Sequence, residues 1–152
     1  MGLQTVLLVV GQSDEGRLHG LTQTTVDIAG PADASVALAH VFTSDEYQQA
    51  RENLDFEEHS QVTPDAIATR YKTIRELAGS MADAGIDYTE HGRLADEDDV
   101  GEQIVSLADA VDADLVVVGG RQRSPTAKAV FGSTAQEILL NAPCPVTFVR
   151  DD

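Results

Sequence analysis

The sequence predicts one α/β domain built on a doubly wound, Rossmann-like parallel sheet of five strands, in the order 3-2-1-4-5, with helices on both faces. Short runs rich in Val, Leu and Ile alternate along the 152 residues with stretches of helical periodicity. The runs are apolar enough for strands that are buried on both sides, as parallel strands are. The length and the 42% hydrophobic content suit a single domain with a sizeable core.

Five short runs are predicted to form the strands. Most are rich in β-branched or aliphatic residues and too short for a helix, and the third is the least apolar. In chain order the predicted strands are Val6 to Val10, Ser35 to Phe42, Ile86 to His91, Leu115 to Val118 and Val146 to Arg150.

Four helices are predicted between these strands. The first follows the turn Gly11 to Asp14 and ends at Gly30-Pro31. The second begins at Thr63-Pro64 and stops at Gly85, and its buried stripe is Ile67, Tyr71, Ile74, Ala78 and Met81.

The third predicted helix follows the acidic residues Asp96 to Asp99, whose charges favour a helix N-terminus. The fourth begins at Ser133 and turns Ile138 and Leu139 inward. Residues 43–63 carry many carboxylates with little periodicity, so we expect an exposed excursion with at most one short helix, and a solvated charged face.

The stretch Leu115 to Gln136 is typical of an anion site. A buried strand ends at Gly119-Gly120, a basic loop follows, and Ser133 and Gln136 are placed as a helix N-cap and its capping-box partner. Backbone N–H groups at a glycine turn and at a helix N-terminus bind phosphates well. The plainer interpretation is an ordinary helix cap after a loop that happens to be basic.

Charge strengthens the anion hypothesis. The chain has 26 acidic and 10 basic residues, yet none of the 22 residues from Leu115 to Gln136 is acidic, and Arg121, Arg123 and Lys128 lie among them. A loop without carboxylates lets an anion approach a protein of net charge −16.

The same composition excludes several function classes. A net charge of −16 opposes binding to nucleic acid or to acidic lipid, and no apolar run is long enough to span a membrane. The N-terminus lacks the pattern of a signal peptide, and the single Cys144 forms no internal disulfide, so we expect a cytoplasmic protein. Sixteen Asp, ten Glu and only two Lys are typical of a protein adapted to concentrated salt, or of an acidic mesophile.

The chain resembles the universal stress protein family over essentially its whole length. The resemblance is carried by the first strand, by the acidic linker after the second strand, and above all by DADLVVVGGRQRSPTAKAVFGSTAQEILLNAPCPVTFVR. Members that bind ATP carry Gly, two residues, Gly, nine residues, and then Gly with Ser or Thr. Here Gly119, Gln122 and the pair Gly132-Ser133 fill these positions.

The resemblance implies a nucleotide site for ATP or AMP, with Mg²⁺ as an accompanying ion. Backbone groups of Val41 would meet the adenine, and Ser133, Thr134 and nearby amides would hold phosphate. The full set of expected nucleotide-binding residues is Gly11, Gln12, Ser13, Val41, Gly119, Gly120, Arg121, Gln122, Arg123, Gly132, Ser133 and Thr134.

Two positions depart from the ATP-binding pattern. Gly11 stands at the end of the first strand where those members usually carry Asp, and Gln122 replaces the second glycine of the loop. The side chain of Gln122 limits how closely its backbone approaches a phosphate, although its amide offers a donor.

Three functions follow from these features. The first is a stress-associated protein that binds an adenine nucleotide and signals through a change in shape or partner. The second is a nucleotide-free dimeric interaction module, which Gly11 and Gln122 favour. The third is a weak ATP hydrolase. The family also implies a homodimer through the last strand, residues 145–150.

The sequence offers no catalytic or metal centre. Its four histidines show no ligand spacing, and we expect His40 to pack or to form a hydrogen bond at the end of the second strand. Cys144 lies between two prolines and is expected to be a packed turn residue. No base and nucleophile are placed together, so an enzyme is the less favoured interpretation.

Overall fold

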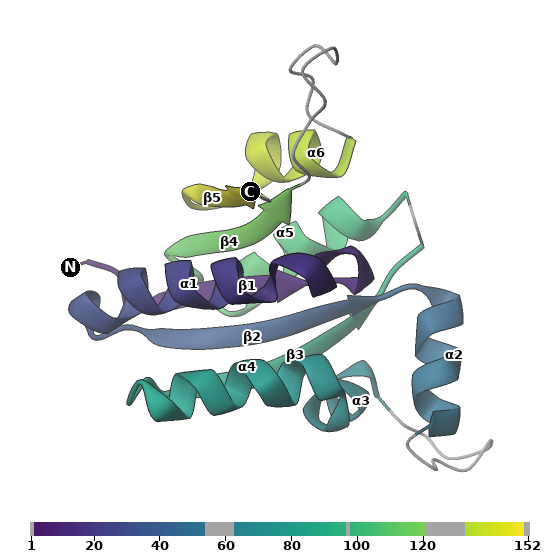
Figure 1. Ribbon diagram of the computed structural model, residues 1–152. Helices are drawn as coiled ribbons and strands as arrows, with labels where there is room; N and C mark the ends of the chain where they lie inside the picture. Colours follow the sequence, from purple (N-terminus) through teal and green to yellow (C-terminus); the bar gives the residue numbers. More distant parts are fainter. Residues whose placement is uncertain (1, 54–62, 97, 121–132, 151–152) are drawn as a thin grey trace.

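The computed structural model describes residues 2–53, 63–96, 98–120 and 133–150 of the chain. All five strands lie parallel in one sheet in the order β3-β2-β1-β4-β5, so the predicted doubly wound topology is confirmed (Figure 1). The strands are β1 (Thr5–Val10), β2 (Ser35–Phe42), β3 (Tyr88–Leu94), β4 (Leu115–Gly120) and β5 (Val146–Arg150).

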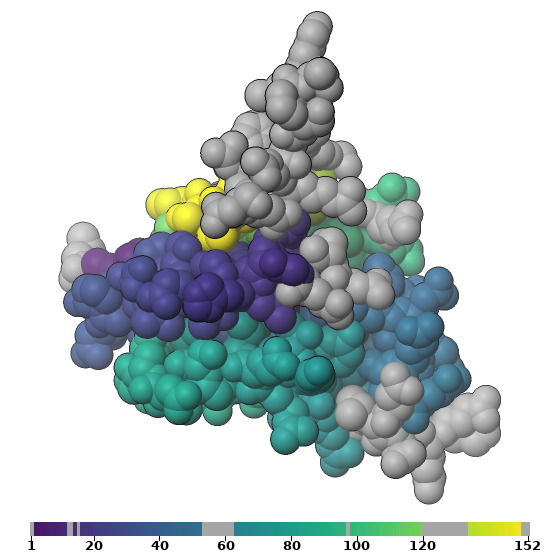
Figure 2. Space-filling model, in the orientation of Figure 1, coloured from purple at the N-terminus to yellow at the C-terminus, as the bar shows by residue number. Residues whose placement is uncertain are grey.

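Helices cover both faces of this sheet. α1, α3 and α4 pack on one face and α5 and α6 on the other, while α2 stands beyond the carboxyl end of β2 (Figure 1). In Figure 2, α1 and α4 lie side by side across the front. The helices are η1 (Gln12–Arg17), α1 (Leu18–Ala32), α2 (Ser44–Asn53), α3 (Pro64–Arg70), α4 (Lys72–Asp83), α5 (Val100–Ala110) and α6 (Ser133–Asn141), where η1 is a 3₁₀ helix.

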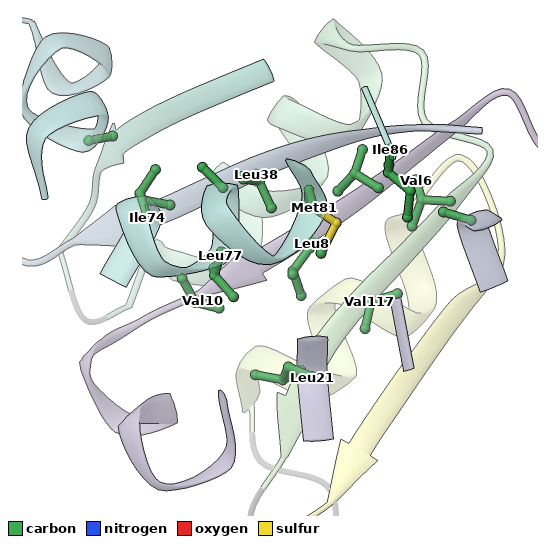
Figure 3. Close-up of a cluster of buried hydrophobic side chains, with 14 of the residues drawn as sticks. Val6, Leu8, Val10, Leu21, Leu38, Ile74, Leu77, Met81, Ile86 and Val117 are labelled. Carbon is green, nitrogen blue, oxygen red and sulfur yellow. The ribbon is translucent and has the colours of Figure 1, made fainter. Parts of the chain in front are cut away.

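The core consists of two layers that the sheet separates. Because side chains alternate along a strand, Leu8 and Val10 face the α1 and α4 side while Leu7 and Val9 face α5 and α6. Figure 3 shows the first layer, where Leu77 and Met81 of α4 pack onto the sheet. Both layers are needed to bury the central strands, which explains why their sequences show no polar alternation.

The first helix is longer than predicted. α1 continues through Pro31 to Ala32 and ends at Asp33, which adopts the left-handed conformation at φ 55° and donates its N–H to the carbonyls of Ala29 and Gly30. A proline in the last turn removes only one helical hydrogen bond, so it did not end the helix where the sequence analysis placed the boundary.

The single helix predicted from Thr63-Pro64 to Gly85 is wrong, because two helices lie there. α3 and α4 are separated by Tyr71, whose backbone is extended at φ −71° and ψ 135°. The ring of Tyr71 packs 4.6 Å from that of His40 between ring centroids. The helical spacing of the apolar residues could not reveal this break, because Tyr71 fits that spacing and the residue that its ring contacts, His40, lies in strand β2.

The third strand lies later than predicted, at Tyr88–Leu94. Ile86 is buried but lies just after the C-terminus of α4, where its N–H donates to the carbonyl of Met81 over 2.9 Å. Gly85 adopts a φ of +73° there, which a glycine C-cap permits. The apolar residue that suggested a strand start therefore closes a helix instead.

Two smaller expectations also fail. Leu139 is 43% exposed, whereas its neighbour Ile138 is buried in the second core layer. α6 begins at Ser133 itself, so Ser133 is the first helical residue and not the residue before the helix. Among the described residues, none of the helices has the length and apolar character needed to cross a membrane.

Candidate functional site

The candidate site lies at the carboxyl end of the sheet, where β1 and β4 run side by side. β1 leads into α1 on one face, and β4 leads toward α6 on the other, so the connections diverge at this point. In doubly wound sheets the crevice between such strands is where ligands bind. Among the described residues, the polar side chains that gather here follow β1.

Gly11 and Val41, two of the predicted nucleotide-binding residues, lie close together at neighbouring strand ends. A side-chain Cβ on Gly11 would lie 4.0 Å from the carbonyl oxygen of Val41 and 4.0 Å from Oδ2 of Asp14. These are ordinary contact distances, so the backbone geometry does not require glycine at position 11. The N–H of Gly11 donates to Asp14 Oδ2 over 2.8 Å.

Gly119 has a different and stricter reason to be glycine. A Cβ there would lie 2.7 Å from Cδ of Arg17 and would also collide with Oδ1 of Asp14. The side chains of Asp14 and Arg17 therefore cross from the end of β1 and cover the end of β4. The first glycine of the loop motif makes room for this ion pair.

Asp14 and Arg17 are the site residues that the sequence analysis missed. Arg17 Nη1 donates to Asp14 Oδ1, and the two residues are only 8% and 7% exposed. A charged pair buried at a switch point is a functional candidate, because burying two charges is costly. The available signal was a carboxylate and a guanidinium three positions apart after the first strand.

A second polar cluster lies under the end of β2. His40 Nε2 lies 3.1 Å from Glu46 Oε2, and the hydroxyl of Tyr71 donates to the same oxygen over 3.2 Å. His40 and Glu46 are 1% and 6% exposed. Within the described part of the chain, His40 Nδ1 and Glu46 Oε1 have no hydrogen-bond partner.

This cluster corrects one expectation and confirms another. His40 does pack and bond at the strand end. However, Glu46 belongs to the charge run that we predicted to be a solvated face, and it is buried. α2 turns Glu46 inward, where its carboxylate accepts the hydroxyl of Tyr71 and lies within hydrogen-bond distance of His40 Nε2. An open cavity of about 440 Å³ lies beside it, lined by residues 43–46, Gln49, Ala95 and Asp96. Its carboxylates make it unsuited to phosphate.

The N-terminal turn of α6 is held in place by α5. A Cβ on Gly101 would lie 2.8 Å from Cβ and Cγ of Glu137 and 3.2 Å from the carbonyl oxygen of Thr134. Glycine at 101 thus lets the two helices approach closely. This contact brings the backbone of Thr134, one of the predicted phosphate-binding residues of that helix, close to α5.

The remaining predicted site residues fall into two groups. Gly120 ends β4 and pairs with Arg150, and Gln12 and Ser13 lie in η1 at the crevice. The predicted residues Arg121, Gln122, Arg123 and Gly132 lie outside the described residues.

The described residues offer little for nucleophilic or metal chemistry. Burial, and then the charge of Asp114, raise the pKa of the Cys144 thiol, which disfavours the reactive thiolate. In the ranges that the structure describes, no three His, Cys, Asp or Glu side chains are grouped so as to hold a metal ion.

A parallel five-stranded sheet with helices on both faces and a switch point between β1 and β4 defines the doubly wound α/β class of proteins. The model of the universal stress protein family matches residues 2–150, so the chain belongs to the universal stress protein family. The resemblance seen in the sequence is thereby confirmed.

Known proteins similar to this chain fit the same family. A universal stress protein of Mycolicibacterium smegmatis is 31% identical over 86 residues, and the match covers 57% of this chain and 65% of that relative, somewhat less than two thirds. The structure of a universal stress protein in complex with cAMP has a TM-score of 0.66 and 23% identity, with 100% of each chain covered. The universal stress protein of Archaeoglobus fulgidus in complex with dAMP has a TM-score of 0.61 and 20% identity, with 96% of each chain covered.

Proposed function

We propose that this protein binds an adenine nucleotide, ATP or AMP, where β1 and β4 end, and that it signals in a stress response through a ligand-dependent change in shape or partner. One observation carries the proposal: Gly11 lies close to the carbonyl of Val41, and Gly119 lies at the end of the neighbouring strand β4, at the switch point of the sheet where ligands commonly bind. The cAMP and dAMP held by the similar proteins support an adenine nucleotide as the ligand.

The proposed pose divides the ligand between two strand ends. The backbone of Val41 meets the adenine, and Gly11, Gln12 and Ser13 lie beside it. The phosphates extend toward Gly119, Gly120 and the start of α6, where Ser133 and Thr134 offer N–H groups and hydroxyls. Arg121, Gln122, Arg123 and Gly132 complete the proposed set.

Mg²⁺ that accompanies ATP is expected to be held by the phosphates and water, as is usual for this ion. The carboxylate of Asp14 already accepts bonds from Gly11 and Arg17. For the same reason we assign no base for ATP hydrolysis at the crevice, and hydrolysis is not part of the proposal.

The first test is direct. The purified protein is unfolded, and the released small molecules are separated by chromatography and weighed by mass spectrometry. The proposal expects an adenine nucleotide to be released or, from protein purified without ligand, titration calorimetry to detect AMP or ATP binding. A protein that releases and binds none refutes it.

The second test concerns what holds the phosphates. At about 1 M KCl the Debye length is ~3 Å, so attraction from distant charges is largely lost while direct backbone bonds persist. We therefore predict that Gly132→Val abolishes ATP binding in molar KCl, because a β-branched side chain blocks approach to the backbone. Arg123→Ala should weaken binding less than about tenfold, or ~1.4 kcal/mol. A larger loss in the arginine variant contradicts the backbone mechanism.

One observation favours the second candidate, a nucleotide-free interaction module. The Asp14–Arg17 pair already fills the space above Gly119 that a phosphate would approach.

In either case we propose a homodimer through residues 145–150, since β5 is an edge strand with apolar side chains. The net charge of −16 supports placing the protein in the cytoplasm of a salt-rich cell.

A further inference from the structure

The buried pair Asp14–Arg17 lies over the end of β4. A Cβ on Gly119 would lie 2.7 Å from Cδ of Arg17 and 3.2 Å from its Nη1, so the arginine side chain rests against the bare backbone of this glycine. In the proposed pose the phosphates of the nucleotide extend toward the same backbone. The ion pair and the phosphates therefore compete for one place.

Two hydrogen bonds hold the pair in this place. Asp14 Oδ2 accepts the N–H of Gly11 over 2.8 Å, and the N–H of Asp14 donates to the carbonyl of Gly11 over 3.0 Å. These bonds tie η1 to the end of β1, with the Asp14 carboxylate bonded to Arg17. Salt screens buried charges much less than surface charges, so the pair stays in place in molar salt.

The element that carries the pair is suited to movement. Asp14 and Arg17 both belong to η1, a six-residue 3₁₀ helix, and the regular helix α1 begins only at Leu18. The hydrogen bonds of a 3₁₀ helix have poorer geometry than those of an α-helix. Because the two charges lie three positions apart on one element, a shift of η1 carries both away together. The shift leaves no lone buried charge, which would be costly.

We propose that Asp14–Arg17 is an autoinhibitory contact that keeps phosphate away from Gly119 until η1 shifts. Adenosine has no phosphate to compete with the pair, whereas AMP and ATP bind only those molecules in which the pair has moved. The apparent affinity for a nucleotide is then lower than the intrinsic affinity by the fraction of open molecules. This inference rests on the proposed nucleotide function and concerns the regulation of the same site.

The test compares AMP with adenosine by titration calorimetry in molar KCl, with the double variant Asp14→Asn/Arg17→Ala. Asparagine keeps an oxygen for the N–H of Gly11, and alanine removes the side chain that rests against Gly119, while the net charge stays the same. This opened variant should bind AMP at least about fivefold more tightly than the wild type, because no closed state competes with the ligand. Its adenosine affinity should stay within about twofold.

A second variant acts in the opposite direction. Gly16 lies in η1, and a Cβ placed there meets nothing within 4 Å, so Gly16→Ala stiffens η1 without a clash. Because replacing glycine with alanine disfavours other backbone conformations, AMP affinity should fall about two- to fivefold and adenosine affinity should not change. This variant decides the question alone if the opened variant does not fold.

A matched control removes an ion pair elsewhere. Lys72→Ala/Glu76→Gln takes one charge of each sign from the exposed face of α4, where the two side chains lie 4.0 Å apart. It should leave both affinities unchanged. Circular dichroism and a thermal melt establish that each variant is folded.

Each outcome decides the question. A gain for AMP alone in the opened variant, or a loss for AMP alone in Gly16→Ala, supports the inference. If the wild type binds AMP but the opened variant binds it no more tightly, the inference is wrong and the nucleotide function stands. Equal changes for AMP and adenosine also overturn the inference. AMP binding by the opened variant alone supports the inference and refutes nucleotide binding by the wild type. If no form binds either compound, both fail.

Discussion

Asp114 joins the starts of two central strands. Its Oδ2 accepts the N–H groups of Gln4 over 2.9 Å and Thr5 over 3.1 Å, and its own N–H donates to the carbonyl of Thr5. These N–H groups, Gln4 first, hold the pKa of Asp114 below its ordinary value, while loss of solvation acts in the opposite direction. The carboxylate therefore stabilises the folded state only while it is ionised.

The sign of the pH effect follows from that lowered pKa. A carboxyl whose folded pKa is depressed contributes full stability above its unfolded pKa of about 4, and the contribution disappears as the pH falls through the folded value. We predict that Asp114→Asn lowers the melting temperature at pH 7 and that the difference from wild type vanishes in strong acid. Thermal melts across this range test it, with the exposed Asp109→Asn on α5 as control. A constant difference at every pH contradicts the mechanism.

The two glycines at the ends of β1 and β4 differ in how strictly their surroundings require glycine. Gly119 is required because Asp14 and Arg17 occupy the place of its side chain. Gly11 has room for a side chain, so its contacts do not require glycine at this position. A sequence motif that contains a glycine does not tell whether neighbouring side chains require that glycine, as at Gly119, or leave room for a side chain, as at Gly11.

At the scale of elements, α2 is attached to the sheet in an unusual way. The helix is mostly polar, and its inward residues are Ala50, the half-buried Tyr47 and the carboxylate of Glu46. Glu46 is bonded to His40 of β2 and to Tyr71, which lies between α3 and α4. One buried side chain thus connects three parts of the fold.

We predict that Glu46→Ala destabilises the protein. The change removes the carboxylate that His40 Nε2 and the Tyr71 hydroxyl contact, and leaving a buried polar group such as His40 Nε2 unsatisfied costs about 1–3 kcal/mol, so a loss of at least about 1 kcal/mol is expected. Glu46→Gln keeps a carbonyl oxygen and should cost less. Chemical denaturation in molar salt measures both, and hydrogen exchange should show faster exchange across α2 in the alanine variant. Equal losses in the two variants would argue that the acceptor is unimportant.

At the scale of the whole molecule, the two edges of the sheet differ. β3 is blocked by α3, since the N–H of Gly92 donates to Asp65 Oδ1 over 2.8 Å and Arg93 Nη1 donates to the carbonyl of Gly92 over 2.9 Å. Side chains thus occupy both peptide groups that this edge residue offers. β5 forms the other edge, and its apolar residues Val146 and Phe148 are only partly buried. An edge strand of this kind favours pairing with another copy of the chain.

The proposed homodimer gives the last prediction. Light scattering in high salt should give twice the 16.2 kDa of one chain, and Phe148→Asp should reduce the mass to that of a monomer, because a charge at the interface resists burial. Phe148→Leu, which stays apolar, and Leu94→Asp, which adds the same charge at the end of β3, should remain dimeric. A monomeric wild type at micromolar concentration refutes the dimer. A melt of each variant checks that the fold is intact.

Much of this fold was open to prediction from the sequence. β2 and β5 match their predicted bounds, β1 starts one residue earlier, and the order of the strands is as expected. β1 and β2 are central strands and β5 is a short edge strand. All three are runs of apolar residues, and such a run can be recognised from neighbouring positions in the sequence alone. The anion-site hypothesis was also local, because the glycines, basic residues and helix start follow one another along the chain.

The sequence by itself determined the family and the parallel sheet, because hydrophobic periodicity and turn residues are properties of neighbouring positions. Tertiary structure alone decided that Tyr71 lies between two helices, that Glu46 is buried against His40, and that Asp14 and Arg17 cover Gly119. These features depend on groups that lie far apart in the chain or on adjacent strand ends. Their energies come from burial and hydrogen bonding in three dimensions, which no local pattern of residues records.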